Sequence, residues 1–165
     1  SPWVVTMEAL RPYRMPGPAR AEGDPAVLDY LRWEDDFVVD VRLEVLLASA
    51  RMREQGMAPT RVSFGTFADM YWTMSQMVAH HTSTGCNMRP GDLLGSGTIS
   101  GPVKESRGCM LERTWRGTEP ITLGDGTERR FLQDGDEVTI RGWCEGAGLP
   151  RLGFGECRGT VLPAQ

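Results

Sequence analysis

The chain has 165 residues, of which 40% are hydrophobic and 24% are charged, and these proportions predict one globular domain with a real hydrophobic core. The net charge of −4 gives no general attraction to nucleic-acid phosphates or anionic membranes, and the sequence has neither an apolar run of membrane-spanning length nor a signal peptide. Because no Cys-x-x-Cys pair occurs, we expect free thiols in a reducing cytoplasm, rather than disulfides or structural zinc, for the four cysteines Cys86, Cys109, Cys144 and Cys157.

The first part of the chain is predicted to be mostly irregular. Residues 3–6 are a strand candidate, and the chain enters it directly after Ser1 and Pro2, with no methionine and no lead-in. We therefore expect this chain to be a fragment, or a cleaved product, of a longer protein. Prolines and glycines between residues 15 and 25 indicate an irregular segment that continues to about residue 34.

A strong period-two pattern follows over residues 37–47. Apolar side chains occupy every second position, and the positions between them include Asp40, Arg42 and Glu44. This alternation predicts one long, half-buried strand. Residues 51–59 are polar and indicate a loop or hairpin arm, and a short strand is predicted near residues 61–64.

One long helix is predicted to begin near Thr66. Thr66 can cap the first turn, and Asp69 three positions later completes a variant of the capping box. Gly85 supplies the left-handed stop. Helical spacing places one set of side chains on a common face: Phe67, Met70, Tyr71, Met74, Met77, Val78 and His81.

After Pro90 the chain is predicted to consist of strands and turns. The strand candidates are residues 93–94, 110–115, 130–131, 137–143 and 156–162. Glycine-aspartate pairs mark the turns at Gly91-Asp92, Gly124-Asp125-Gly126 and Gly135-Asp136. The sequence therefore predicts an α+β, mainly β domain over residues 1–165, in which one long helix packs on a rolled or curved mixed sheet.

Two histidines are present, His80 and His81, at the end of the predicted helix. Neighbours on a helix point about 100° apart, so the pair is poorly placed to bind one metal ion. A histidine near a helix C-terminus is also favoured by the helix dipole whatever its function. A structural role is the main interpretation, and a role as general base for one of them is the alternative.

Several acidic residues could suggest a cation site, among them Asp35, Asp36 and Asp40. A hard cation needs several converging oxygen ligands, whereas the polar face of a strand usually just meets water. Solvation is therefore the favoured interpretation for these residues and for Glu44. Asp92 and Asp136 follow glycines and are interpreted as turn formers.

Glu112 is different because it lies in an apolar predicted strand and shares a face with Met110. A buried carboxylate is costly unless it is paired. Either it forms a salt bridge with a neighbouring arginine, or it holds a histidine in one tautomer and stabilises it when it becomes charged. The sequence leaves both alternatives open.

Two more candidates carry weaker signals. Thr98 lies in Ser96-Gly97-Thr98-Ile99-Ser100-Gly101, where flanking glycines let backbone amides approach an anion, although the motif lacks the lysine and spacing of a phosphate loop. Cys86 has no base spaced to activate it convincingly, so a small hydrophobic role is the favoured interpretation.

The chain resembles the C-terminal core of the fumarylacetoacetase family over nearly its whole length. The resemblance depends on a long ordered series of motifs, which is more specific than any one of them. The series includes Ser1-Pro2-Trp3-Val4-Val5, Met70-Tyr71-Trp72-Thr73-Met74, His80-His81, Arg89-Pro90-Gly91-Asp92-Leu93-Leu94, Ser96-Gly97-Thr98-Ile99-Ser100-Gly101-Pro102, Met110-Leu111-Glu112, Trp115-Arg116-Gly117-Thr118, Asp134-Gly135-Asp136-Glu137-Val138 and Gly153-Phe154-Gly155.

This resemblance implies an enzyme that hydrolyses the carbon–carbon bond of fumarylacetoacetate to fumarate and acetoacetate in tyrosine and phenylalanine catabolism. In the family a divalent cation, Mg²⁺ or Ca²⁺, binds the diketo group, a histidine activates water, a glutamate orients that histidine, and a lysine stabilises developing negative charge. By the same resemblance, Glu112 is the histidine-orienting glutamate and Thr98 contacts the substrate. The catalytic histidine, the lysine and all four metal carboxylates are expected upstream of Ser1, and His80-His81 matches a pair that is not the catalytic base.

The resemblance therefore implies a C-terminal portion that supplies scaffold, one substrate contact and one carboxylate, and that is inactive alone. It also implies a cytoplasmic homodimer, a diketo-acid substrate, and neither nucleic acid nor membrane as partner. Two alternatives stay open. One is a related decarboxylase, hydratase or acylpyruvate hydrolase, and the other is a non-enzymatic β-rich interaction module with an exposed apolar patch.

Overall fold

A computed structural model describes residues 1–34, 36–146 and 148–164. The fold is α+β and mainly β, as predicted. Its helices are α1 (Met7–Leu10), α2 (Ala50–Glu54), α3 (Met74–Thr82) and α4 (Met110–Arg113), with 3₁₀ turns η1 (Arg11–Tyr13), η2 (Asp29–Leu31), η3 (Phe67–Asp69) and η4 (Lys104–Ser106). Its strands are β1 (Arg14–Pro16), β2 (Phe37–Val39), β3 (Arg42–Ala48), β4 (Thr60–Thr66), β5 (Ile121–Thr122), β6 (Glu128–Arg129), β7 (Glu137–Gly146) and β8 (Leu149–Thr160).

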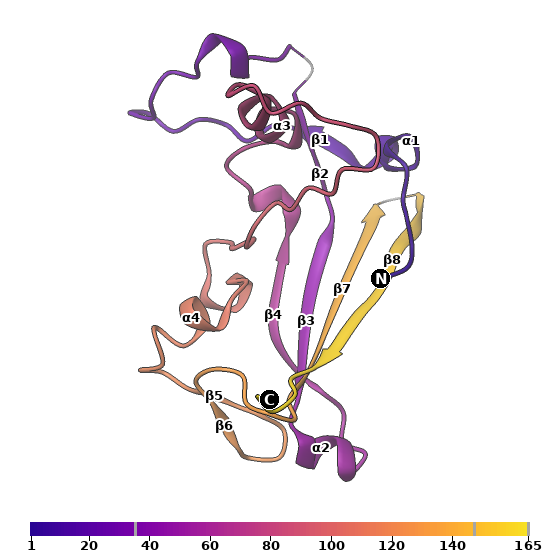
Figure 1. The fold of residues 1–165 in the computed structure, drawn as a ribbon, viewed down its shortest axis with the longest axis vertical. Coiled ribbons are helices and arrows are strands. Elements are labelled where there is room, and N and C mark those ends of the chain that lie inside the picture. Colours follow the sequence, from indigo (N-terminus) through magenta and orange to yellow (C-terminus); the bar gives the residue numbers. More distant parts are fainter. Residues whose placement is uncertain (35, 147, 165) are drawn as a thin grey trace.

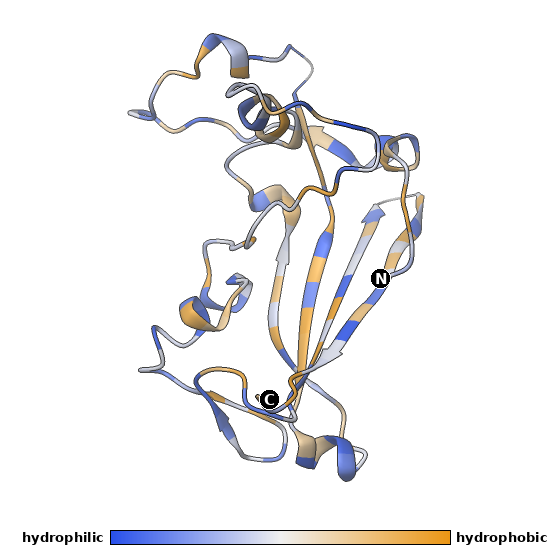
Figure 2. Cartoon of the chain, in the orientation of Figure 1, coloured by the Kyte–Doolittle hydropathy of each residue, from blue (hydrophilic) through white to orange (hydrophobic). Residues whose placement is uncertain are grey.

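The centre of the molecule is a four-stranded sheet in the order β4-β3-β7-β8 (Figure 1). The described strand pairs are all antiparallel, so the predicted mixed sheet is wrong for this part of the chain. In β3, Val45 pairs with Ser63 of β4 on one side and Ile140 of β7 on the other. Hydropathy alternates along the central strands (Figure 2), which is the pattern expected of a sheet with two unlike faces.

The predicted strand over residues 37–47 is divided in two. At the break, the amide of Val41 donates to the carbonyl of Val39 over 2.8 Å, and the amide of Asp40 donates to Tyr13 O over 3.0 Å. After this tight turn the chain changes partners: β2 pairs with β1, whereas β3 lies in the central sheet. One alternating pattern therefore covers two strands that belong to different sheets.

The predicted long helix is also divided. Thr66 does act as a cap, but of the 3₁₀ turn η3, where its Oγ1 accepts from the amide of Ala68 over 3.1 Å. The α-helix α3 begins only at Met74, where Thr73 and Gln76 form a reciprocal capping box. With nine residues, α3 is the longest helix in the described part of the chain, and Gly85 beyond it has the predicted left-handed conformation (φ 87°).

Other local predictions were wrong at the level of single elements. Residues 3–6 and 93–94 form no strand, residues 51–59 include most of α2, and residues 110–115 contain the helix α4. Residues 130–131 form no strand either, because β6 ends at Arg129, just before them. The strands predicted near 61–64 and at 137–143 are confirmed as parts of β4 and β7. The strand predicted at 156–162 is confirmed as far as Thr160, where β8 ends.

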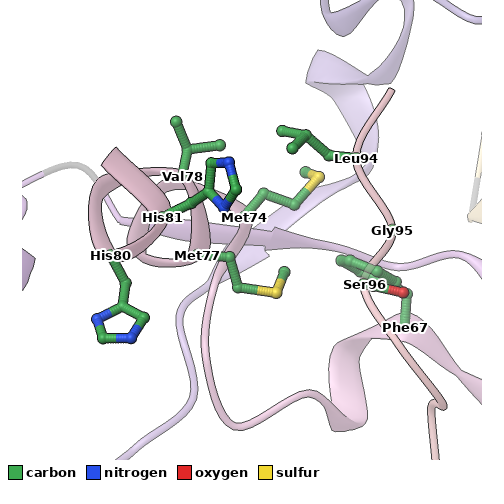
Figure 3. Close-up of a pocket in the computed structure, with 9 residues that line it drawn as sticks. All are labelled: Phe67, Met74, Met77, Val78, His80, His81, Leu94, Gly95 and Ser96. Atoms are coloured by element: carbon green, nitrogen blue, oxygen red, sulfur yellow. The ribbon is translucent and has the colours of Figure 1, made fainter. Parts of the chain in front are cut away.

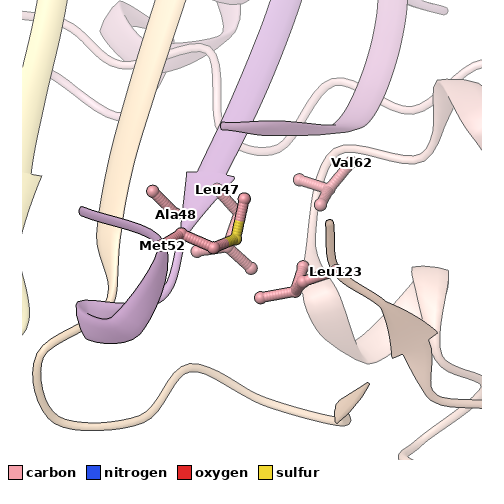
Figure 4. Close-up of a cluster of buried hydrophobic side chains, with 5 residues drawn as sticks. All are labelled: Leu47, Ala48, Met52, Val62 and Leu123. Atoms are coloured by element: carbon pink, nitrogen blue, oxygen red, sulfur yellow. The ribbon is translucent and has the colours of Figure 1, made fainter. Parts of the chain in front are cut away.

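Two small hydrophobic cores are found among the described residues. The first lies beside α2, at the lower end of the central sheet in Figure 1, and consists of the side chains drawn in Figure 4: Leu47, Ala48, Met52, Val62 and Leu123. The second lies where α1, η1 and β2 meet β7, and consists of Leu10, Tyr13, Val39 and Cys144. Burial, with a smaller contribution from Asp40, raises the pKa of the Cys144 thiol to about 11, as expected for a thiol that acts as a core hydrophobe. All four cysteines are free thiols.

In the described part of the chain, the helices are too short and too polar for any of them to cross a membrane.

Candidate functional site

A shallow cavity of about 480 Å³ brings together Glu112 and Thr98, the two residues singled out from the sequence. It lies between η3, the loop that follows Gly95, and α4. The described residues that line it are Asp69, Met70, Tyr71, Thr98, Ser100, Cys109, Leu111 and Glu112. Two carboxylates, two aliphatic hydroxyls and a thiol thus share a cavity wall with a tyrosine and two apolar side chains.

Glu112 lies on the helix α4, and not on the strand predicted for it. Its carboxylate is half-buried and is held by two donors. Ser100 Oγ donates to Glu112 Oε2 over 2.6 Å, and Cys109 Sγ donates to the same oxygen over 3.3 Å. Among the ion pairs of the described residues none involves Glu112, so the salt bridge considered from the sequence is not observed there.

Arginine side chains fix α4 against the rest of the fold. Arg113 donates from Nε to the carbonyl of Val62 on β4 over 2.7 Å, and from Nη1 to the carbonyl of Lys104 over 3.0 Å. Arg107 stacks on Trp115 at 4.3 Å and donates to the carbonyl of Glu112 over 3.3 Å. These contacts set the position of α4, and with it Glu112, relative to the central sheet.

The loop that carries Thr98 lies very close to its neighbours, and glycine permits this contact. A Cβ at Gly108 would lie 2.2 Å from Ile99 O and 3.0 Å from Thr98 Cγ2. A Cβ at Gly101 would lie 2.4 Å from Asp69 Oδ2. The glycines therefore let the loop lie against η3 and α4, and the side chain of Thr98 stays exposed at the cavity wall.

Neither histidine lines this cavity. His80 Nδ1 is 3.0 Å from Tyr30 Oη, and the two rings stack. His81 Nε2 is 3.2 Å from Cys86 Sγ. The imidazoles point in different directions from α3 (Figure 3), and both lie at a separate, largely apolar pocket. These contacts favour the structural interpretation of the pair.

The expectation that no base serves Cys86 was wrong. The turn after α3 brings the thiol of Cys86 next to the imidazole of His81, which lies five residues earlier in the chain. Because Cys86 and His81 are both exposed and lie outside the cavity of Glu112, this contact does not make Cys86 a nucleophile for that site.

Acidic residues that the sequence suggested for cation binding or turns form hydrogen bonds and ion pairs within the protein. Asp40 accepts from Thr66 Oγ1 over 3.0 Å, and Glu44 faces two arginines at 3.7–3.8 Å. Asp92 accepts from the amide of Arg89 over 2.8 Å, as a turn former does. Asp35 lies outside the described residues. In residues 1–34, 36–146 and 148–164 no group of three or more metal-ligating side chains converges.

Sequence reasoning missed Ser100, Cys109 and Asp69 as parts of the site. Ser100 lies in the same glycine-rich motif as Thr98, which was the available signal, but its contact with Glu112 crosses twelve residues of chain. Only the turn through η4 brings the two together.

Comparison with known proteins places the chain in a family. Residues 1–162 match the family described as Fumarylacetoacetate (FAA) hydrolase C-terminal. The chain is 50% identical over 164 residues to the fumarylacetoacetase of Homo sapiens, 48% identical over 166 residues to that of Dictyostelium discoideum, and 46% identical over 164 residues to that of Arabidopsis thaliana. Each match covers 99% of this chain and 37% of the relative, so the chain spans little more than a third of their length. With this match over almost every residue, the chain belongs to the fumarylacetoacetate hydrolase C-terminal family.

Proposed function

We propose that the protein containing this chain hydrolyses the carbon–carbon bond of fumarylacetoacetate to give fumarate and acetoacetate, in tyrosine and phenylalanine breakdown. One observation carries the proposal: Glu112 and Thr98 line a common cavity in a chain that is 50% identical to a protein named fumarylacetoacetase. The resemblance assigns both residues to one active site. Their position in a common cavity supports that assignment.

The chemistry proposed for Glu112 is electrostatic. Attack of water on a ketone needs a base, and the base becomes positively charged as it takes the proton. A carboxylate that accepts a hydrogen bond from an imidazole fixes its tautomer and stabilises the imidazolium. We place this histidine in the part of the relatives' length that the chain does not span. Thr98, whose hydroxyl can donate, is proposed to contact a substrate oxygen.

The resemblance also implies a divalent cation, Mg²⁺ or Ca²⁺. The described residues do not fit such an ion, because no three metal-ligating side chains converge in them. We therefore propose that its ligands lie outside the described residues. Homodimer formation and a cytoplasmic location remain proposals from the resemblance.

The Glu112→Gln variant of the full-length protein tests the assignment. We expect kcat for fumarylacetoacetate to fall about 100-fold with KM changed less than about threefold, because the lost charge matters most when the imidazole is protonated. A matched control is Glu8→Gln, which changes an exposed glutamate paired with Arg11 at the surface. Wild-type turnover in a folded Glu112→Gln protein would contradict the proposed role.

The substrate is tested separately. Turnover of an acylpyruvate or a dienoate by the full-length protein, in preference to fumarylacetoacetate, would favour the related hydrolases, decarboxylases or hydratases.

A further inference from the structure

Ser100 connects the loop of Thr98 to α4 through two hydrogen bonds on one oxygen. Its Oγ accepts from the amide of Gly108 over 3.1 Å and donates to Glu112 Oε2 over 2.6 Å. A serine hydroxyl has one proton. Because the amide of Gly108 occupies a lone pair of Oγ, the proton of Ser100 is directed at the carboxylate of Glu112.

The two oxygens of Glu112 are therefore not equivalent. Oε2 accepts from Ser100 and also from Cys109 Sγ over 3.3 Å. The hydrogen bonds found for this carboxylate within the described residues all involve Oε2. Hydroxyl-to-carboxylate bonds of this length are among the stronger hydrogen bonds in proteins, so Oε2 is fixed and Oε1 is available to a further donor.

We propose that Ser100 is a positioning residue that holds the carboxylate of Glu112 so that Oε1 faces the group that Glu112 orients. This inference rests on the proposed function, in which that group is the imidazole of the general base. Turnover depends steeply on the placement of reacting groups, and a side chain without its supporting hydrogen bond samples other rotamers. The contribution of Ser100 thus belongs to turnover and not to substrate affinity.

Kinetics of the full-length protein test the proposal with two substitutions at one position. For Ser100→Ala we expect kcat to fall about tenfold with KM within about twofold of wild type. For Ser100→Thr, which keeps a hydroxyl, we expect kcat to recover to within about threefold of wild type. Ser83→Ala is the matched control, because Ser83 also donates one short hydrogen bond, to His80 O over 2.7 Å, outside the cavity. Equal kcat in wild type and folded Ser100→Ala would overturn the inference.

A double-mutant cycle separates a positioning role from a structural one. If Ser100 acts through Glu112, adding Ser100→Ala to Glu112→Gln should lower kcat by less than about twofold further. A full additional tenfold loss would show an effect independent of Glu112 and would overturn the inference. Cys109→Ala removes the weaker donor on the same oxygen, and its expected kcat lies between those of wild type and Ser100→Ala. If Ser100→Ala does not fold, the Cys109→Ala variant provides the test instead. A wild-type kcat in Cys109→Ala would then contradict the inference that turnover depends on hydrogen bonds to Glu112 Oε2.

The inference and the proposed function fail in different ways. If Glu112→Gln loses turnover and Ser100→Ala does not, only the positioning role of Ser100 is wrong. If the full-length protein does not hydrolyse fumarylacetoacetate, or if Glu112→Gln is fully active, the proposed function or the role of Glu112 is wrong.

Discussion

Arg129 and Asp136 form a buried ion pair in which both carboxylate oxygens accept hydrogen bonds from the guanidinium. Arg129 Nε lies 2.8 Å from Asp136 Oδ2 and Arg129 Nη2 lies 2.9 Å from Asp136 Oδ1. Asp136 is 0% exposed, and its Oδ2 also accepts from the amide of Gln133 over 2.9 Å. The hydrogen bonds that Arg129 donates to Asp136 raise the pKa of its guanidinium above the usual value. The sequence identified Asp136 as a turn former, which the structure confirms, but carried no sign of its partner.

Removing one member of this pair should be strongly destabilising. Asp136→Asn leaves the guanidinium of Arg129 buried without the carboxylate that pairs with it, and we expect the free energy of unfolding to fall by about 3–5 kcal/mol. The control is Glu156→Gln, which breaks the exposed pair with Arg141 and should cost less than about 1 kcal/mol. Urea denaturation of the two variants beside wild type checks the difference. Equal effects would show that burial of the Arg129 pair does not matter.

The hairpin of β5 and β6 is joined to α2 through the side chain of Asp125. Ser49, the N-cap of α2, donates from Oγ to Asp125 Oδ2 over 2.6 Å. Thr127 donates to Asp125 Oδ1 from both its amide, over 3.0 Å, and its hydroxyl, over 2.7 Å. These hydrogen bonds, that from Ser49 first, lower the pKa of Asp125 to about 2. The turn signal Gly124-Asp125-Gly126 thus does two things: it reverses the chain and connects two elements.

The depressed pKa of Asp125 predicts a defined pH dependence. The ordinary value is 3.8 and the folded value is about 2, so the stabilisation from ionised Asp125 is present above about pH 4 and disappears as the pH falls toward 2. The Asp125→Asn variant should be less stable than wild type at about pH 6, and the two should converge near pH 2. Thermal unfolding of both proteins across this range measures the effect. A stability difference that persists at the acidic end would show that charge on Asp125 is not its source.

At the scale of the whole molecule, the cavity of Glu112 is chemically incomplete. Of the described residues that line it, none is a histidine, lysine or arginine. These residues therefore offer no base matched to neutral pH and no cation to stabilise an alkoxide. Much apolar surface is also exposed, with Leu93 at 97% and Val4 at 91%. The chain spans 37% of the length of these relatives.

We predict that residues 1–165 alone do not hydrolyse fumarylacetoacetate. The reason is that the described residues lining the cavity include neither a histidine nor a positively charged side chain, whereas the proposed reaction needs a base and a positive charge. The assay combines the isolated chain with substrate and Mg²⁺ or Ca²⁺, with the full-length protein as positive control and circular dichroism to establish folding. Turnover by the isolated chain would overturn the prediction.

Local patterns were enough to determine the parts of this protein in which each residue's neighbours along the chain set its environment. The period-two alternation located β3, and the glycines at 85, 91 and 135 marked turns in which they have positive φ. The ordered motifs indicated the family. The helix cap was predicted at the wrong residue. The capping box joins Thr73 to Gln76, whereas Thr66 caps only a 3₁₀ turn. A cap signal in the sequence does not reveal which type of helix follows it.

Tertiary structure decided what depends on contacts between distant residues. The same alternating pattern runs through residues 37–47, yet the bonds from Asp40 to Tyr13 and from Val41 to Val39 mark where it divides between two sheets. Residues 110–113 have the apolar content of a strand, but they form a helix that Arg113 ties to β4 and η4. Glu112 shares a cavity with Thr98 and accepts a hydrogen bond from Ser100 only because the chain turns back through η4. Periodicity reports which face of an element is buried, whereas the partner that buries it is set by packing across the chain.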